Sequence, residues 1–261
     1  MNNMEKKNFL SYSLFSERLS ELPAEAPLMI NTINQYSYCM AEKDSLYKKS
    51  LLESDVLLPD GISIVLAAKF LNNTTLKKIA GADVHKHFLR ELNQVSGSCF
   101  YLGASERVLR LIKRKIERNY PNVRVGSYSP PYKPAFSNTD NEEMVEAINN
   151  FAPDVLFVGM TAPKQEKWVY QNRGSLNVRV ICTIGAVFDF YAGVIMRPGK
   201  IWIDLGLEWL GRLYSEPRRL AKRYLYYGPV FIYLMLAAKL KGEKTLWPRE
   251  WLVEKKTGTI R

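Results

Sequence analysis

The sequence predicts an α/β fold built on a mostly parallel sheet, and three observations support that prediction. Short apolar runs recur along the first 200 residues, each followed by a stretch with helical spacing, an alternation typical of a parallel sheet with helices on both faces. The runs are apolar almost throughout, as expected for strands covered on both sides. From about Trp202 the strand pattern stops. We therefore expect a Rossmann-like domain over residues 1–200 and a C-terminal helical, membrane-associating appendage over residues 201–261.

The individual elements follow from apolar runs and from helix start and stop signals. Ser105 and Glu106 look like a capped helix start, and Asn119-Tyr120-Pro121 looks like a stop. The expected strands are Leu28–Ile33, Asp55–Leu58, Cys99–Leu102, Val123–Gly126, Asp154–Gly159 and Val178–Ile184. The expected helices are Tyr38–Glu53, Ile62–Leu71, Asp83–Leu92, Ser105–Asn119, Thr139–Phe151 and Pro163–Arg173.

In a sheet of this kind ligands bind beyond the carboxyl ends of the strands. The segments expected there carry polar residues or glycines, which permit sharp turns or close backbone approach to a ligand. They are residues 31–34, 59–61, 103–105, 159–161 and 185–189. Neither G-x-G-x-x-G nor G-x-x-x-x-G-K-[ST] occurs in the sequence, which disfavours a dinucleotide-dependent dehydrogenase and a P-loop ATPase.

Composition and charge narrow the class further. The chain has 261 residues, of which 47% are hydrophobic, and a net charge of +11. Residues 211–261 hold 12 Lys or Arg and 4 Asp or Glu, so +8 of that charge lies in the last fifth. A basic tail on a nearly neutral body suggests an anionic partner, which is a membrane surface, a phosphate ligand or nucleic acid. The three cysteines and two histidines fit no metal-binding or redox spacing, and we expect neither a metal nor a cofactor.

The tail also contains an apolar and aromatic run, Tyr224–Ala238, which is interrupted by Gly228-Pro229. The run is shorter than the ~20 residues of a membrane-spanning helix. Arg223 precedes it and Lys239 follows it. This pattern favours an interfacial helix pair, and the alternative is a C-terminal helix packed on the core.

The stretch "PDVLFVGMTAPKQEKW" runs from an apolar strand directly into a proline and polar residues. We expect Pro163 at the first helical position with Ala162 as its cap. Alanine has no side-chain acceptor, so the first-turn N–H groups stay open. An open helix start at the edge of a parallel sheet, next to Lys164 and Gln165, suits a phosphate-bearing ligand. An ordinary strand-to-helix turn is the alternative.

This stretch and several others resemble the WecG/TagA/CpsF family of bacterial glycosyltransferases, glycosyltransferase family 26. The similar pieces are "TINQYS", "LLPDGISIV", "KIAGADV", "FYLGAS", "PDVLFVGMTAPKQEKW", "TIGAVFDFYAGVIMRPGKIW" and "GLEWLGRLYSEPRRLAKRYL". They follow one another in order from Thr32 to Leu225 and cover most of the chain. The P-K-Q-E and L-E-W-x-x-R-x-x-x-E-P pieces are specific in combination.

The resemblance implies an inverting enzyme that moves a sugar from a UDP donor to a polyprenyl-diphosphate-linked sugar. Such enzymes serve teichoic acid, capsule and exopolysaccharide synthesis. An N-acetylmannosamine-type donor sugar is favoured, and glucose is the other possibility. The expected place is the cytoplasmic face of the bacterial inner membrane, as a peripheral protein that also self-associates. Inverting transfer needs a base for the acceptor hydroxyl and positive charge for the diphosphate.

Asp60 is the candidate base, because it follows an apolar strand and precedes Gly61. The resemblance places the family's proposed base at this aspartate, and the alternative is an aspartate that caps the helix from Ile62. Thr32 and Asn34 match the family's T-x-N element and are expected to contact substrate; a turn held by their own side chains is the alternative.

Other substrate contacts are implied at Lys164 and Gln165 of P-K-Q-E. Lys78 stands where the family usually has arginine, and lysine keeps the charge without the bidentate fork. Asp83 contacts a ligand or caps the next helix. Asp189 reaches the nucleotide or shapes its loop as a buried aspartate.

Two further positions depart from the family pattern, since Thr161 and Ser63 replace common glycines. Both add side chains near the expected pocket, where they either tune sugar specificity or have no effect.

The basic residues of the tail are expected to hold a diphosphate. Arg212 and Arg219 are seven residues apart and share a helix face if Pro217 starts a new helix without a large bend. Lys222 and Arg223 continue the row. The alternative is a solvated basic face. At the level of the whole chain, the alternatives are a non-catalytic module that binds nucleotide or nucleic acid, and an inactive scaffold. The apolar run at 231–234 argues against nucleic acid as a partner.

Overall fold

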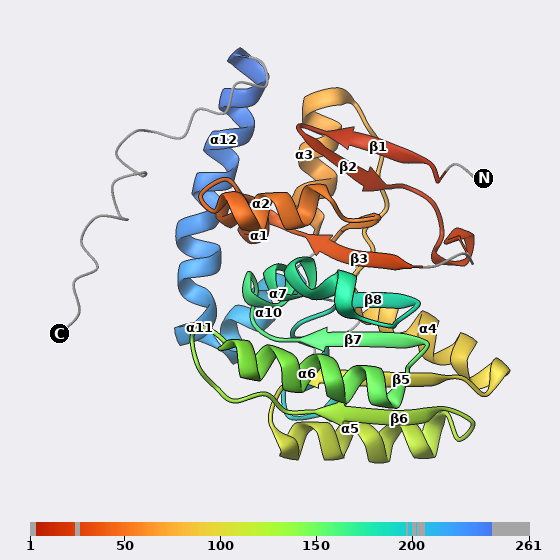
Figure 1. The fold of residues 1–261 in the computed structure, drawn as a ribbon. Coiled ribbons are helices and arrows are strands. Elements are labelled where there is room, and N and C mark those ends of the chain that lie inside the picture. The colour runs from red at the N-terminus through yellow and green to blue at the C-terminus, as the bar shows by residue number, and fades with distance from the viewer. Residues whose placement is uncertain (1–3, 24–26, 197, 200–201, 203–206, 242–261) are drawn as a thin grey trace.

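A six-stranded parallel sheet with helices on both faces forms the centre of the protein (Figure 1). The computed structural model describes residues 4–23, 27–196, 198–199, 202 and 207–241. The strand order is β4-β3-β8-β7-β5-β6, and every neighbouring pair is parallel. The strands are β3 (Leu28–Ile33), β4 (Val56–Pro59), β5 (Ser98–Gly103), β6 (Arg124–Tyr128), β7 (Val155–Gly159) and β8 (Val180–Thr183). The predicted fold class is therefore confirmed.

The helices cover the sheet in two layers because successive side chains of a strand point to opposite faces. Cys99 and Tyr101 of β5 pack with α4 (Gly81–Val95), α5 (Glu106–Asn119) and α8 (Val187–Ala192). Phe100 and Leu102 pack with α6 (Asn138–Phe151) and α7 (Lys164–Asn172) on the other face. Both faces are buried, which explains why the strands are apolar almost throughout.

Two features near the N-terminus differ from the sequence prediction. An antiparallel hairpin, β1 (Lys6–Phe9) and β2 (Tyr12–Phe15), precedes the sheet and was not predicted. The expected helix over 38–53 is instead two helices, α1 (Gln35–Ala41) and α2 (Ser45–Leu52). Each has its own side-chain cap. Asn34 Oδ1 accepts hydrogen bonds from the backbone N–H groups of Tyr36 and Ser37, and Asp44 Oδ1 accepts one from Tyr47.

The C-terminal segment packs on the body through one face of its last helix. It contains α10 (Glu208–Ser215), α11 (Pro217–Ala221), a π-helical turn (Lys222–Tyr226) and α12 (Tyr227–Lys241). Buried side chains of α12 share a cluster with α1, α2, α3 (Ile62–Asn72) and the β1–β2 hairpin; they are Tyr227, Val230, Phe231, Leu234 and Met235. The alternative considered for the tail, a C-terminal helix packed on the core, is therefore correct for the buried face of α12. The domain boundary at residue 200 stays a prediction. Within the described ranges, no helix is long and apolar enough to cross a bilayer.

Candidate functional site

A cavity of about 340 Å³ lies beyond the carboxyl ends of β3 and β4, between the body and the C-terminal helices. The arrowheads of the parallel strands in Figure 1 point toward this side of the molecule, where α10, α11 and α12 lie. The cavity is lined by Asn34, Gln35, Asp60, Gly61, Ile62, Ser63, Lys78, Glu208, Trp209, Arg212, Arg223, Tyr224, Gly228, Pro229, Phe231 and Ile232. Five of the predicted site residues are among them: Asn34, Asp60, Lys78, Arg212 and Arg223.

Asp60 is held at the cavity by the backbone around it. It directly follows β4, and its N–H donates to the carbonyl oxygen of Ile33 at 2.8 Å. Gly61 has a φ of +109°, which residues other than glycine rarely adopt. The chain can therefore turn sharply just after the Asp60 carboxylate. Burial raises the pKa of Asp60 to about 6, and the nearby carboxylate of Glu208 adds to the rise while Lys78 and Arg212 oppose it. A carboxylate with this pKa can accept a proton near neutral pH.

Asn34, Gln35 and Ser63 form the neutral wall beside Asp60. Asn34 lines the cavity, but its Oδ1 caps α1. The alternative considered for this residue, a turn held by its own side chain, is therefore observed. Ser63 Oγ donates to Gln35 Oε1 at 2.5 Å. The serine that replaces a family glycine therefore lies in the cavity wall, whereas Thr161 is exposed and outside it.

Lys78 joins the body to the C-terminal segment across the cavity. Its Nζ lies 3.0 Å from Glu208 Oε2, and both side chains are largely buried. Since 130 residues separate the two partners, sequence reasoning did not find Glu208, although it lies in the quoted "LEWL" piece.

Arg212 and Arg223 bring two guanidinium groups to the same cavity. Arg212 Nε and Nη2 are buried and have no hydrogen-bond partner in the part of the chain that the structure describes. The group lies against the ring of Phe190, with its Cζ 5.1 Å from the centroid. Arg223 stacks on Tyr36 at 4.3 Å, and burial lowers its pKa. Leaving buried donors of a cation unsatisfied is costly, so the arrangement is suited to an anion that accepts them.

The other two cations of the predicted row lie elsewhere. Glu216 leaves the helical conformation, with φ −135° and ψ 60°, and Pro217 then starts α11. Arg219 therefore does not follow Arg212 into the cavity; it is exposed and pairs with Glu216 at 2.7 Å. Lys222 is exposed and does not line the cavity either. A diphosphate contact of Arg219 or Lys222 stays a prediction from the sequence, and their positions outside the cavity favour the solvated basic face instead.

The P-K-Q-E segment lies at the end of β7 and its polar atoms bond mainly within the protein. The helix begins at Lys164 with Pro163 as its cap residue, one residue later than predicted. Gln165 is buried; its Oε1 accepts from the N–H of Met160 at 3.1 Å and its Nε2 donates to Glu166 Oε1 at 2.9 Å. Lys164 Nζ donates to the carbonyl oxygen of Lys133 at 2.5 Å. Neither Gln165 nor Lys164 lines the cavity.

Glu166 is a buried acid that sequence reasoning did not single out. Its side chain is 2% exposed, Oε2 has no hydrogen-bond partner among the described residues, and burial raises its pKa to about 7. The hydroxyl of Tyr47 on α2 is also buried, has no hydrogen-bond partner in the described ranges, and interacts electrostatically with Glu166. Nothing in the sequence marks Glu166 as buried, because the residues on either side of it, Gln165 and Lys167, are polar.

The remaining predicted residues surround the site without lining the cavity. Thr32 is half-buried within β3 and lies opposite Leu58 of β4. Asp83 Oδ2 accepts from the N–H of Ala80 at 2.9 Å, which is the helix-capping role considered for it. Asp189 lies in α8, where burial raises its pKa and Arg219 opposes the rise. Substrate contacts of these three stay predictions.

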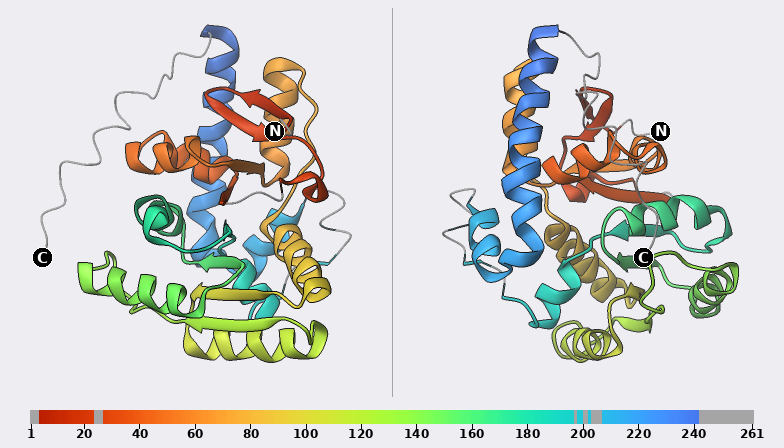
Figure 2. Two further views of the ribbon diagram at one scale, coloured as in Figure 1. Left: turned by 45° about the vertical axis from the view of Figure 1, so that its right-hand side comes forward. Right: turned by 90° about the vertical axis from the view of Figure 1, so that its left-hand side faces the viewer.

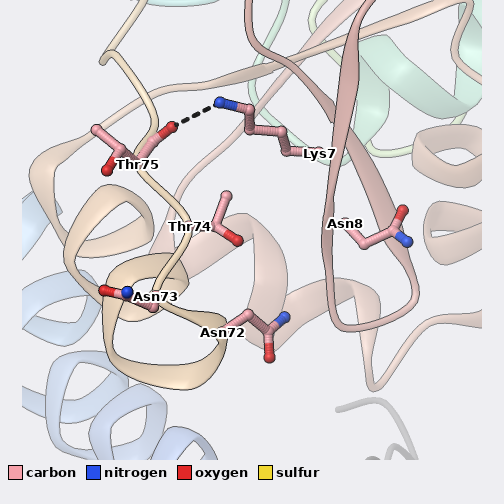
Figure 3. Close-up of a pocket in the computed structure, with 6 residues that line it drawn as sticks. All are labelled: Lys7, Asn8, Asn72, Asn73, Thr74 and Thr75. Atoms are coloured by element: carbon pink, nitrogen blue, oxygen red, sulfur yellow. Dashed lines mark hydrogen bonds between the residues drawn. The ribbon is translucent and has the colours of Figure 1, made fainter.

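A second hollow, of about 540 Å³, lies between the β1–β2 hairpin and the segment after α3 (Figure 3). Lys7 Nζ donates to the carbonyl oxygen of Thr75 at 3.3 Å, and the other lining side chains are neutral amides and hydroxyls. It holds no acid–base pair. No group of three or more His, Cys, Asp or Glu in the described ranges is arranged to hold a metal ion.

Comparisons with known proteins agree with the motifs. The family described as "Glycosyl transferase WecG/TagA/CpsF family" matches residues 8–245. One similar protein, from Bacillus subtilis (strain 168), is named N-acetylglucosaminyldiphosphoundecaprenol N-acetyl-β-D-mannosaminyltransferase; it is 33% identical over 221 residues, which are 85% of this chain and 83% of that protein. Proteins of the same name occur in Bacillus spizizenii, at 28% identity over 69% of this chain and 68% of the relative, and in Staphylococcus aureus (strain MW2), at 26% over 83% of each.

Proposed function

This chain belongs to the WecG/TagA/CpsF family of glycosyl transferases, and on that premise we propose that it transfers an N-acetylmannosamine-type sugar from UDP to a polyprenyl-diphosphate-linked N-acetylglucosamine. The names of three relatives at 26–33% identity support both the sugar and the acceptor. UDP as the carrier follows from the resemblance of the motifs. Membership in an enzyme family sets aside the non-catalytic binding module as an alternative.

The observation that carries the proposal is that Asp60 and Arg212 line one cavity, where Arg212 Nε and Nη2 have no hydrogen-bond partner among the described residues. In the proposed reaction a hydroxyl oxygen of the acceptor sugar attacks C1 of the donor sugar. The bond from C1 to the diphosphate oxygen breaks, and the electron pair leaves with UDP. Asp60 accepts the hydroxyl proton, as its pKa of about 6 permits near neutral pH.

The cations of the cavity stabilise the diphosphate charge. Arg212 offers two buried donors, and Arg223 is fixed by its stacking on Tyr36. Charge-assisted hydrogen bonds from guanidinium groups to phosphate oxygens are among the strongest in proteins. Lys78 pairs with Glu208 and exchanges this partner for phosphate when a diphosphate binds.

A peripheral position at the inner membrane's cytoplasmic face accompanies this function. The acceptor is a lipid, +8 of the net charge lies in residues 211–261, and α12 exposes apolar side chains. Synthesis of teichoic acid or a related surface polysaccharide is the expected context. Self-association stays a prediction, which light scattering of the purified protein tests.

The decisive experiment measures UDP release by the purified protein with a short-chain prenyl-diphosphate N-acetylglucosamine acceptor and a panel of UDP-sugars, with product masses. We expect one N-acetylhexosamine donor to give a product larger by one sugar residue. If no UDP-sugar is consumed, or if Asp60→Asn matches the wild type with the active donor, the proposal is wrong.

A further inference from the structure

Helix α3 exposes a row of apolar side chains although it belongs to the body of the protein. Ile62, Leu66 and Phe70 are four residues apart, so they share one face of the helix, and they are 37%, 58% and 47% exposed. The opposite face, with Ile64, Ala67, Ala68 and Leu71, is buried in the core. A helix at a water-facing surface normally presents polar side chains on its outer face, so this row needs a partner.

Helix α12 carries a matching row. Ile232, Leu236 and Leu240, again four residues apart, are 61%, 48% and 82% exposed, and Tyr233 is 48% exposed beside them. Its other face packs on α1 and α3. We call the six residues Ile62, Leu66, Phe70, Ile232, Leu236 and Leu240 the α3–α12 face.

The two rows run side by side from the cavity outward. Ile62 and Ile232 both line the cavity at one end. At the other end Lys239 of α12 donates its Nζ to the carbonyl oxygen of Leu71 at 2.7 Å and lies 5.7 Å from the ring of Phe70. Each row spans about 12 Å, since eight residues of helix rise 1.5 Å each. The right-hand view of Figure 2 shows α3 and α12 next to each other along one edge of the molecule.

We infer that the α3–α12 face enters the apolar layer of a bilayer, so that the catalytic body itself supplies half of the membrane-docking surface. The inference rests on the proposed lipid-linked acceptor. Both rows begin at the cavity that holds Asp60 and Arg212, where a headgroup anchored in that bilayer would have to arrive. Lys69 and Lys239 are exposed beside the far end of the rows, where they suit anionic headgroups.

The same geometry explains why α3 contributes to docking rather than the C-terminal segment alone. Helix α3 starts two residues after Asp60, so a bilayer that holds α3 also fixes the turn carrying the base. Helix α12 follows directly on the turn that carries Arg223. One flat contact with lipid thereby aligns both walls of the cavity with the membrane plane.

The test measures flotation of the full-length protein with vesicles of phosphatidylglycerol and phosphatidylcholine, without any sugar substrate. We expect the double variant Leu66→Ser/Phe70→Ser to bind at least about tenfold more weakly than wild type, because two large apolar side chains no longer enter lipid. Val95→Ser is the matched control: Val95 is 72% exposed at the end of α4, and its variant should bind like wild type. Thermal melting establishes that each variant is folded.

A second measurement does not depend on loss of function. All three native cysteines are buried, so Leu66→Cys can carry an environment-sensitive fluorophore. Its emission should shift to the blue when vesicles are added, and the same label on Val95→Cys should not respond. Unchanged vesicle binding of the double variant, or an unresponsive label at position 66, overturns the inference. Both results are expected if residues 242–261 or a second copy of the chain, rather than lipid, covers the α3–α12 face.

The outcomes separate this inference from the proposed function. Turnover of the short-chain, water-soluble acceptor should be the same in Leu66→Ser/Phe70→Ser and wild type, because neither side chain lines the cavity. Vesicle binding without turnover by any variant contradicts the proposed function only. Turnover together with undiminished vesicle binding of the double variant contradicts the docking face only.

Discussion

The carboxyl edge of the sheet carries two groups of polar side chains, and they differ in where their hydrogen bonds go. At the end of β7, the side chains of Gln165 and Lys164 form hydrogen bonds within the protein, to Met160, Glu166 and Lys133. At the ends of β3 and β4, by contrast, two buried donors of Arg212, Nε and Nη2, have no hydrogen-bond partner in the part of the chain that the structure describes. Unsatisfied polar groups that line a cavity indicate where a ligand binds, whereas satisfied ones hold a turn in shape. Glu166 Oε2, next to Gln165, also lacks a partner among the described residues, but it lines neither cavity.

This contrast predicts that Asp60 and its neighbour Asp83 respond differently to the same substitution. Asp60→Asn should lower kcat by about 10² to 10⁴-fold, the usual contribution of a general base. Asp83→Asn, which keeps an acceptor for the Ala80 N–H, should lower kcat only slightly. UDP release at saturating substrates measures both. Similar losses in the two variants would mean that the assignment of the base is wrong.

The buried acid of the β7 group should affect stability rather than turnover. The pKa of Glu166 is about 7 in the folded protein, whereas the ordinary value for a glutamate, which applies in the unfolded chain, is 4.5. The folded state therefore keeps a proton that the unfolded state releases, so the Glu166 contribution is complete below pH 4.5 and is lost as the pH rises through 7. The loss is on the order of 3 kcal/mol of unfolding free energy.

Urea unfolding at pH 4.5 and pH 8 tests this expectation. Glutamine does not titrate, so Glu166→Gln should remove the part of the decline in unfolding free energy that Glu166 causes. The variant should therefore become more stable relative to wild type as the pH rises. Part of the decline remains in the variant, because the pKa of Asp60 is also raised. The same pH dependence in variant and wild type would contradict a protonated, buried Glu166.

A smaller effect is expected on the pH profile of the reaction. Turnover should rise with pH through about 6 as Asp60 loses its proton, because the deprotonated form is the base. The carboxylate of Glu208 raises this pKa and also occupies Lys78. Glu208→Gln should therefore move the midpoint to lower pH. A midpoint that stays fixed, or moves upward, would show that Glu208 does not act on the base.

Much of the fold could be predicted because the signals are local. The run Leu28–Ile33 is a strand with the predicted bounds, and the other five strands lie within two residues of theirs. The break between α1 and α2 was missed because Asn34 and Asp44, which cap them, were not recognised as caps. The β1–β2 hairpin was missed because its strands have four residues each and contain serine or asparagine.

The site could be predicted residue by residue but not as an arrangement. The family and its activity class are confirmed, and the motifs named Asp60 and Arg212 before either was seen to line a cavity. Spacing of seven residues suggested that Arg219 would join Arg212, but the backbone of Glu216 leaves the helix between them. Contacts such as Lys78 with Glu208 depend on how distant segments fold together, which no local pattern encodes.

The central claim is that the cavity shared by Asp60 and the C-terminal segment is where the diphosphate chemistry occurs, and Arg212→Ala compared with Arg219→Ala tests it most directly. We predict that Arg212→Ala lowers kcat/KM for UDP release by about 100-fold or more, as removal of a transition-state donor does. Arg219→Ala should stay within about threefold, since an exposed ion pair contributes little. Equal losses in the two variants, or an Arg212→Ala protein as active as wild type, would contradict the account.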